Sequence, residues 1–456
     1  MLFICCSLKD SSFIIHNSSL NHMTYSKTID YLYQNLPMFH RVGSVAFKKD
    51  LTNTIALCDV LGNPQTKFPT IHIGGTNGKG STAHMIAAIL QSLGLKVGLY
   101  VSPHYRDFRE RIKINGDYMA KKAVVQFVET HRTHFEQIEP SFFEMTVAMA
   151  FDYFATEGVD VAVIEVGLGG RLDSTNVIAP MISVITNISL DHTDMLGDTL
   201  PLIAFEKAGI IKSKTPVVIG EEHVETKPVF EQKAVEMNAP ISFASQIFAV
   251  KPTAQDFDYT TFEVFRNKKL VFDALKVNVG GDYQAKNVAT VLQIFEILKT
   301  LPFFSRYTEG VINQAIRDGF LNLVALTKFI GRWQVIAREP TILCDSAHNE
   351  GGLTLAMNQL NTLKFNKLHI VLGVVKDKDI SKMLKLLPTD ATYYFAKANI
   401  PRGLDAEILR GLAEQTGRHG KAYKSVRRAL AAAKKRANSD DLIYVGGSIF
   451  VLAEVI

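Results

Sequence analysis

The stretch GGTNGKGS, from Gly74 to Ser81, decides how this chain of 456 residues folds. It follows the apolar run TIHIG, residues 70–74, and precedes helical apolar spacing over about residues 82–93. These flanks predict a buried strand and a helix. Successive backbone N–H groups at a strand-to-helix junction can hold phosphate oxygens, because the helix N-terminus carries partial positive charge. We therefore predict a phosphate-binding loop, in which Lys79 reaches the terminal phosphates.

The loop departs from the general Walker pattern in two places. Ile73 stands five positions before Gly78, where that pattern has glycine, and Gly80 follows Lys79 in place of serine or threonine. A tight glycine turn between a strand and a helix, without a ligand, is the alternative interpretation.

Other apolar runs extend the strand pattern along the N-terminal half. They lie at residues 96–101, 159–167 and 181–188, and they are continuously apolar rather than alternating. Such strands are typically covered on both faces of a parallel sheet, with helices as the crossover connections. The pattern predicts a doubly wound α/β domain.

Later segments change this pattern. Residues 241–279 contain two strand-like runs around a polar RNKK turn, which predicts a β-hairpin appended to the sheet as a small insert. After a helical stretch at residues 285–300, periodicity fades near residues 321–331. A second series of strand-like runs then begins at Thr341, Leu368, Thr392 and Leu442.

The chain is thus expected to have an α/β fold with two Rossmann-like domains. We assign residues 1–22 to a disordered extension and residues 23–328 to a larger, P-loop ATPase-type domain with the small β insert. Residues 329–456 form the smaller C-terminal α/β domain in this assignment. Ligands should bind in the cleft between the two domains.

Composition excludes several other classes of protein. Lys and Arg total 50 against 45 for Asp and Glu, without a long run of like charge, which argues against a nucleic-acid-binding arm. The four cysteines form no C-x-x-C pair, so neither a zinc site nor a disulfide scaffold is indicated. No apolar stretch reaches the ~20 residues that cross a bilayer, and the first residues lack the features of a signal peptide. We predict a cytoplasmic protein that binds neither membranes nor nucleic acid.

Several long motifs accompany the loop. They are SPHYRDFRERIKING from Ser102, SFFEMTVAMAFDYF from Ser141, EVGLGGRLDSTN from Glu165, NISLDHTDMLGDTLPLIAFEKAGIIK from Asn187, GRWQ from Gly331, DSAHN from Asp345 and VGGSIFV from Val445. Together with TNGKGS, they resemble the folylpolyglutamate and dihydrofolate synthases of the Mur ligase superfamily over nearly the whole chain after Met23. Ser346 departs from the family pattern, which has glycine there.

The resemblance implies an ATP-dependent ligase. Such enzymes transfer the γ-phosphoryl group of ATP to a carboxylate, and the amine of L-glutamate then attacks the acyl phosphate. Dihydropteroate becomes dihydrofolate, and reduced folates gain γ-linked glutamates. The resemblance also implies ATP as co-substrate, one or two Mg²⁺ ions, and a monomer. The alternatives are a folylpolyglutamate synthase only, another Mur-type amino-acid ligase such as those that build cell-wall peptides, and a non-catalytic nucleotide-binding module.

A metal site and a modified lysine are also implied by the resemblance. Ser102, Glu165 and His192 match Mg²⁺ ligand positions, although a structural hydrogen bond for His192 and a helix cap for Glu165 are the plainer interpretations. Lys207 matches a lysine that the family carries as a carbamate, which requires a lowered pKa. Its alternative is an ion pair with Glu206 or a neighbouring helix residue.

Nucleotide and glutamate contacts follow from the same resemblance. The ATP-binding positions are Asn77, Gly78, Lys79, Gly80, Ser81, Asn287, Arg332 and Asp345; an acidic residue suits ribose hydroxyls. An interdomain salt bridge is the alternative role of Arg332. The candidate catalytic residues are Lys79, Lys207 and His348, and His348 and Ser448 are candidates for holding the incoming glutamate.

The dihydropteroate-binding positions form a third set. They are Gly75, Thr76, Phe143, Glu144, Leu172, Asp173 and Ser174. An aromatic ring at Phe143 suits stacking on a pterin. Whichever of Phe142 and Phe143 faces inward is better interpreted as helix core, so only Phe143 is assigned to the site.

Overall fold

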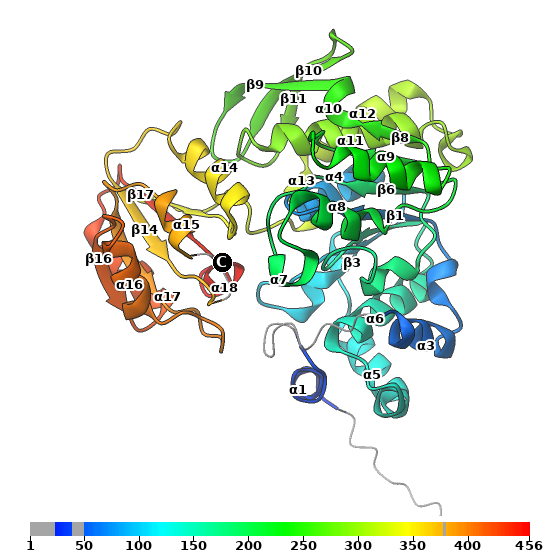
Figure 1. Cartoon of the computed structure of the whole chain (residues 1–456), viewed down its shortest axis with the longest axis horizontal. Helices are drawn as coiled ribbons and strands as arrows, with labels where there is room; N and C mark the ends of the chain where they lie inside the picture. The colour runs from blue at the N-terminus through cyan, green and yellow to red at the C-terminus, as the bar shows by residue number, and fades with distance from the viewer. Residues whose placement is uncertain (1–22, 39–49, 377–379) are drawn as a thin grey trace, which may run out of the picture.

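The computed structural model describes residues 23–38, 50–376 and 380–456, so the expected extension at residues 1–22 lies outside the described residues. Figure 1 shows two α/β bodies side by side, with a small sheet above them. We call them the N-terminal body, up to residue 328, and the C-terminal body, from residue 329.

The N-terminal body is built on an eight-stranded sheet. In spatial order its strands are β4 (Asp117–Tyr118), β3 (Ile112–Ile114), β2 (Val97–Tyr100), β5 (Val161–Glu165), β1 (Thr70–Gly74), β6 (Ile182–Ile185), β7 (Val217–Ile219) and β8 (Ile241–Phe243). From β2 to β8 the neighbouring strands are parallel, as predicted for β2, β5, β1 and β6, while β7 and β8 extend the parallel sheet beyond the predicted strands. The β3–β4 hairpin, which adds an antiparallel edge, was not predicted because its strands are only three and two residues long.

Helices cover both faces of this sheet. Along β5, Val161 and Val163 face one core, while Ala162 and Ile164 face the other. This alternation explains why a strand buried on both sides reads as continuously apolar. The first face is covered by α4 (Lys79–Ser92), α11 (Gln284–Leu298) and α12 (Glu309–Leu321), and the second by α1 (Tyr25–Asn35), α3 (Thr52–Val60), α5 (Lys121–Ile138), α6 (Phe142–Glu157), α8 (Leu200–Ala208) and α9 (Lys227–Glu236). None of the helices in the described ranges is long and apolar enough to cross a membrane.

The expected hairpin insert is wrong in detail. Residues 241–243 form β8 of the main sheet, and the insert is a separate three-stranded antiparallel sheet of β9 (Phe248–Gln255), β10 (Thr260–Arg266) and β11 (Lys269–Val277). The missed strand, β9, is mostly exposed and carries Pro252, so its sequence lacks a core-facing pattern. Phe262 and Val264 of β10 pack into the same core as α11.

The C-terminal body repeats the architecture on a smaller scale. Its six strands are β12 (Gln334–Arg338), β13 (Thr341–Cys344), β17 (Leu442–Gly446), β14 (Leu368–Leu372), β15 (Thr392–Ala396) and β16 (Gly420–Tyr423), all parallel except β12. The helices are α14 (Glu350–Leu360), α15 (Ile380–Lys385), α16 (Ala406–Glu414), α17 (Val426–Arg436) and α18 (Ile449–Leu452). The predicted fold class, two α/β layers with a β insert, is therefore confirmed.

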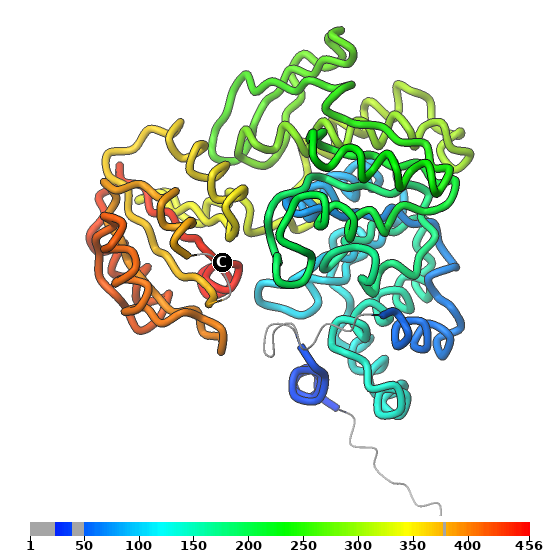
Figure 2. The backbone as a smooth tube through the Cα atoms, in the orientation of Figure 1, coloured from blue at the N-terminus to red at the C-terminus, as the bar shows by residue number. Residues whose placement is uncertain are grey.

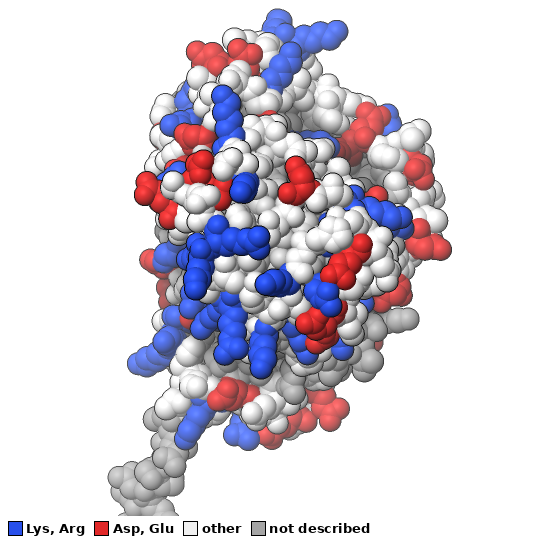
Figure 3. All heavy atoms as spheres, turned by 90° about the vertical axis from the view of Figure 1, so that its left-hand side faces the viewer, with Lys and Arg blue, Asp and Glu red and all other residues white. Residues whose placement is uncertain are grey.

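Positive charge gathers on the outer side of the C-terminal body. The segment from Lys421 to Arg436, which includes α17, contains basic residues and no acidic one. Figure 3 views this side and shows Lys and Arg side chains clustered there, with Asp and Glu placed around them. Such a face raises the local concentration of anionic small molecules.

The connection between the bodies is short and strongly turned. It follows α13 (Leu323–Thr327), and Lys328, Gly331 and Trp333 all have positive φ values, of 50°, 75° and 47°. The buried Lys113 of β3 holds its start, since Nζ donates to Thr327 O at 3.0 Å and Lys328 O at 3.3 Å. The turns explain why periodicity fades here, and Figure 2 shows the chain crossing between the bodies at this point.

The helix α4, which carries the phosphate loop at its start, is buried from Ser81 to Leu90. It packs against α12, where Gly319 lies so close that an added Cβ would be 2.6 Å from Ile89 Cα and 2.7 Å from Ile89 N. At Gly310, on the same helix, an added Cβ would meet nothing within 4 Å.

This pair of glycines gives a matched test of the packing. Gly319→Ala should destabilise the protein by about 1–3 kcal/mol, because overpacking against backbone exceeds the gain in helix propensity. Gly310→Ala should leave the free energy of unfolding unchanged or raise it by up to about 1 kcal/mol, because alanine favours the helix. Urea denaturation of both variants measures the difference; equal stabilities would mean that α4 and α12 do not pack as closely as described.

Candidate functional site

A pocket lies between the two bodies, at the C-terminal ends of strands from both sheets. Loops after β1, β2, β5 and β6 supply one wall, and the loop after β13 supplies the other. The pocket encloses about 1260 Å³, including space open to solvent. This is where doubly wound sheets gather their ligand sites, because helix N-termini and loop ends converge there.

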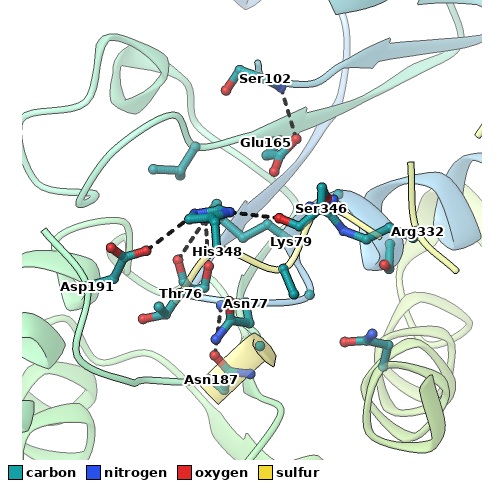
Figure 4. A pocket seen from close by; sticks show the side chains of 18 of the residues that line it. Thr76, Asn77, Lys79, Ser102, Glu165, Asn187, Asp191, Arg332, Ser346 and His348 are labelled. Atoms are coloured by element: carbon teal, nitrogen blue, oxygen red, sulfur yellow. Dashed lines mark hydrogen bonds and ion pairs between the residues drawn. The ribbon is translucent and has the colours of Figure 1, made fainter. Parts of the chain in front are cut away.

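Most of the predicted site residues line this pocket. They are Gly75, Thr76, Asn77, Gly78, Lys79, Gly80, Ser81, Ser102, Glu165, His192, Lys207, Asn287, Arg332, Asp345 and His348. Figure 4 shows many of them facing one another around the loop. The remaining six, Phe143, Glu144, Leu172, Asp173, Ser174 and Ser448, are not among its lining residues.

The phosphate loop is shaped by two glycines at which any side chain would be strained. A Cβ at Gly75 would lie 2.0 Å from Thr186 Oγ1, and one at Gly78 would lie 2.3 Å from Asn287 Oδ1. Both glycines also have positive φ, of 134° and 82°. The helix α4 starts at Lys79 rather than near Thr82 as predicted, because the left-handed Gly78 ends the loop. Lys79, Gly80 and Ser81 therefore form the first turn of a helix, whose backbone N–H groups have no acceptor within the helix, the arrangement that binds anions.

Two lysines converge on one backbone carbonyl of the loop. Gly75 O accepts from Lys79 Nζ at 3.0 Å and from Lys207 Nζ at 2.8 Å, and Lys79 also donates to Thr76 O at 3.1 Å. Burial, and to a lesser extent the nearby Lys79 charge, lowers the pKa of Lys207 to about 7. Burial lowers the pKa of Lys79 as well. The alternative ion pair with Glu206 is not found, since Lys207 Nζ donates to Gly75 O and Glu206 pairs with Arg171 at 2.8 Å.

Glu165 provides a buried negative charge opposite the loop. It ends β5, is 4% exposed, and its Oε2 accepts from Ser102 N at 3.0 Å, a contact drawn in Figure 4. Burial raises its pKa, while Lys79 opposes that shift. A cation beside it would favour the ionised form. This hydrogen bond holds the loop after the neighbouring strand β2, so Glu165 is not the helix cap considered from sequence.

The predicted metal ligands fit Mg²⁺ chemistry only in part. Ser102 and Glu165 are adjacent oxygen donors, which is the ligand type that Mg²⁺ prefers. His192 lies on the following loop with φ of 50°, and its Nε2 is 4.0 Å from Asp191 Oδ1. Within the described residues, no three His, Cys, Asp or Glu side chains are grouped to hold a metal ion.

The adenosine-side residues are braced from both bodies. Asp345 accepts from Trp333 N at 2.9 Å, from Tyr283 Oη at 3.3 Å and from Ala347 N at 2.8 Å. Arg332 donates to Tyr105 Oη at 3.1 Å. Within the described residues its other hydrogen bond goes to Gly331 O at 3.3 Å, so its partner in the other body is a hydroxyl rather than the carboxylate of a salt bridge.

Two of the predicted dihydropteroate-binding carboxylates form hydrogen bonds with the protein's own backbone. Glu144 caps α6, where its Oε2 accepts from Ser141 N at 2.6 Å. Asp173 accepts from Leu168 N at 2.8 Å and so shapes the loop after β5. Phe143 stands against Gly167, whose added Cβ would lie 2.4 Å from the ring, so it lies just behind the pocket wall. Phe142 is core, with 3% exposure.

Ser448, predicted to hold glutamate, is the N-cap of α18. Its hydroxyl accepts from Phe450 N at 3.1 Å, and the residue is 2% exposed. Leu172 and Ser174 lie on either side of Asp173 in the loop after β5. A carboxylate or hydroxyl in a sequence motif does not reveal whether it faces a ligand or its own backbone.

Sequence reasoning also missed residues that the structure places at the pocket. Asp191 lines it and lies 3.7 Å from His348 Nε2, the contact across the cleft drawn in Figure 4. Tyr283, Asn187 and Ser346 line it as well. The signal was present, because Asp191, Asn187 and Ser346 stand inside the motifs LDHTDMLG, NISLDH and DSAHN.

Comparisons with known proteins agree with this arrangement. The family described as Mur ligase middle domain matches residues 73–295, and the Mur ligase, glutamate ligase domain matches residues 331–449. The chain is 33% identical to folylpolyglutamate synthase of Lacticaseibacillus casei over 95% of this chain and 98% of that protein. It superposes on E. coli FolC in complex with DHPP and ADP with a TM-score of 0.81 and 28% identity, covering 95% of this chain and 97% of that one.

The chain also resembles a longer archaeal protein. It is 32% identical to the probable bifunctional folylpolyglutamate synthase/dihydropteroate synthase of Haloferax volcanii over 95% of this chain, and it spans 50% of that protein's length. Identity of this extent along both bodies, with the phosphate loop and the second-body motifs in the same pocket, leaves one assignment. The chain belongs to the folylpolyglutamate synthase family of the Mur ligases.

Proposed function

We propose that this protein is an ADP-forming ligase that joins L-glutamate to dihydropteroate, forming dihydrofolate, and to the γ-carboxyl of reduced folates. The observation that carries the proposal is the convergence of Lys79, Lys207 and the α4 N-terminus on one pocket that the second body closes. Transfer of a phosphoryl group to a carboxylate depends mainly on positioning and on neutralising the phosphate oxygens. This pocket supplies both.

The residues of the chain divide the work between the bodies. The loop amides and Lys79 hold the terminal phosphates of ATP; Lys79 exchanges its bonds to Gly75 O and Thr76 O for phosphate oxygens. Asp345 and Arg332 orient the nucleotide from the second body, and His348 faces the space where the glutamate amine attacks the acyl phosphate. Ser102, Glu165 and His192 would hold Mg²⁺, which neutralises phosphate charge when bound.

Lys207 acts as a carbamate in this proposal. A pKa of about 7 leaves much of its amine neutral near physiological pH, and only a neutral amine adds CO₂. The product is an anion that faces the Lys79 ammonium and the N-terminus of α4, in place of a second positive charge beside Lys79. Such an exchange of sign relieves the repulsion between Lys207 and Lys79.

The remaining assignments extend the proposal. Residues 23–328 serve as the ATP- and folate-binding domain and residues 329–456 as the glutamate-ligase domain of a monomeric, cytoplasmic enzyme. A non-catalytic nucleotide-binding module is disfavoured, because simple binding does not need the buried Glu165 and Lys207. Two alternatives differ from this proposal in their substrates. One is a folylpolyglutamate synthase that lacks the dihydrofolate synthase step, and the other is another Mur-type ligase.

The phosphate role of Lys79 predicts loss of ligation on its removal. Lys79→Ala should lower amide formation from ATP, Mg²⁺, glutamate and dihydropteroate on the order of 10²- to 10³-fold, because one preorganised positive donor is lost at the phosphates. Lys233→Ala, on the surface of α9, is the control and should ligate normally. The assay measures ADP release and the new pteroyl–glutamate amide by mass spectrometry.

Substrate choice decides between the related activities. Extension of tetrahydrofolate alone would reject the dihydrofolate synthase half of the proposal. ADP release without any pteroyl–glutamate amide would reject the folate substrates altogether.

The carbamate on Lys207 is tested by a readout that needs no turnover. Protein kept in ¹³C-bicarbonate should show a carbamate carbon resonance in the wild type and none in Lys207→Arg, since a guanidinium does not add CO₂. The resonance should weaken as pH falls below about 7, because the amine is protonated below its pKa. A wild-type spectrum without this signal at pH 8 would remove the carbamate.

A further inference from the structure

Asn349 bridges the two bodies at the phosphate loop. It is the N-cap of α14, where its Oδ1 accepts from Gly352 N at 2.8 Å. Its Nδ2 donates across the cleft to Asn77 Oδ1 and to Asp191 Oδ2, each at 3.0 Å. One side chain therefore joins a helix of the C-terminal body to two loops of the N-terminal body.

The start of α14 lies directly against the loop. A Cβ at Gly351 would be 3.4 Å from Asn77 Nδ2 and 3.6 Å from Ser189 Oγ. Asn349 itself is 5% exposed, so water competes little for its hydrogen bonds. The two bodies therefore lie within van der Waals reach of one another at the start of α14.

Both partners of Asn349 are tied to the nucleotide pocket. Asn77 directly precedes Gly78, and its backbone N donates to Asn187 Oδ1 at 2.9 Å. Asp191 also lies 3.7 Å from His348 Nε2, so Asp191 receives two neighbouring side chains of the C-terminal body. A substitution at Asn349 therefore removes a contact from the phosphate loop and another from Asp191.

We propose that Asn349 is a positioning residue for ligation, whose amide locks the C-terminal body against the phosphate loop. This inference rests on the proposed function. The loop and Lys79 belong to one body, whereas Arg332, Asp345 and His348 come from the other, so their relative placement sets the reacting geometry. Displacements near 1 Å reduce such reactions on the order of 100-fold.

Another contact between the bodies offers a contrast. Arg338 pairs with Asp258 of the insert at 2.5 Å, but the two side chains are 55% and 52% exposed and do not line the pocket. Exposed ion pairs of this kind contribute little. Arg338→Ala is therefore a matched control that removes a cross-body contact away from the loop.

Two substitutions separate the lock from the helix cap. Asn349→Ser and Asn349→Asp both keep an acceptor for Gly352 N, so α14 keeps its cap. Aspartate has no donor, and the single hydroxyl proton on the shorter serine side chain cannot replace both amide bonds to Asn77 and Asp191. Asn349→Ser should lower kcat by about 10- to 100-fold, and Asn349→Asp should lower it further because it adds a like charge beside Asp191. The KM for dihydropteroate should stay within about twofold, since its predicted residues belong to the N-terminal body.

Small-angle X-ray scattering in Mg²⁺ and ADP provides the second readout. Both Asn349 variants should have a larger radius of gyration than the wild type, while Arg338→Ala should match the wild type in radius and kcat. Wild-type kcat and radius in both Asn349 variants would reduce Asn349 to a helix cap and overturn the lock. Failure of the wild type to form any amide would instead reject the proposed function, and the scattering would still decide whether the lock exists.

Discussion

The structure depends on one unfavourable arrangement: two lysine amines held against a single backbone carbonyl, Gly75 O. Placing two positive groups in a buried pocket is costly, and burial pushes both pKa values down. The eight-stranded sheet supports this arrangement, because Gly75 follows the central β1 and Lys207 is fixed on α8. The buried Glu165 offsets part of the positive charge. The site thus carries an excess of positive charge before any ligand binds, and the negative charge of a triphosphate would balance it.

The two bodies apply one architectural rule twice. Each has a mainly parallel sheet, and in each the loops after the strands carry the polar groups. Facing the two loop edges toward one another encloses a pocket without burying backbone groups that lack partners. The second body therefore adds Asp345 and His348 at the points where the first body already presents its loop. Helix ends and loops, rather than the sheet cores, meet across the cleft.

Sequence pattern predicted the elements whose signal is long and local. The central strands and α11 were placed within a few residues, since burial on both faces leaves a continuous apolar run. The edge strands β3, β4, β9, β12 and β16 and the three-residue β7 were missed, because short or exposed strands carry little apolar pattern. At the site, the loop and Lys207 were found through their motifs. Glu144 and Asp173 show the limit, because the same carboxylate can bind a ligand or its own backbone.

The anchored connection between the bodies has a mechanical consequence. Lys113 fastens the chain through the carbonyls of Thr327 and Lys328, and the next strand begins at Gln334. Rotation of one body relative to the other is thereby confined to a handful of backbone bonds close to the pocket. A short pivot beside the reacting groups turns a small torsional change into a small linear displacement there and a large one at the far edge. A rotation between the bodies about this connection would therefore displace their outer edges more than the groups that line the pocket.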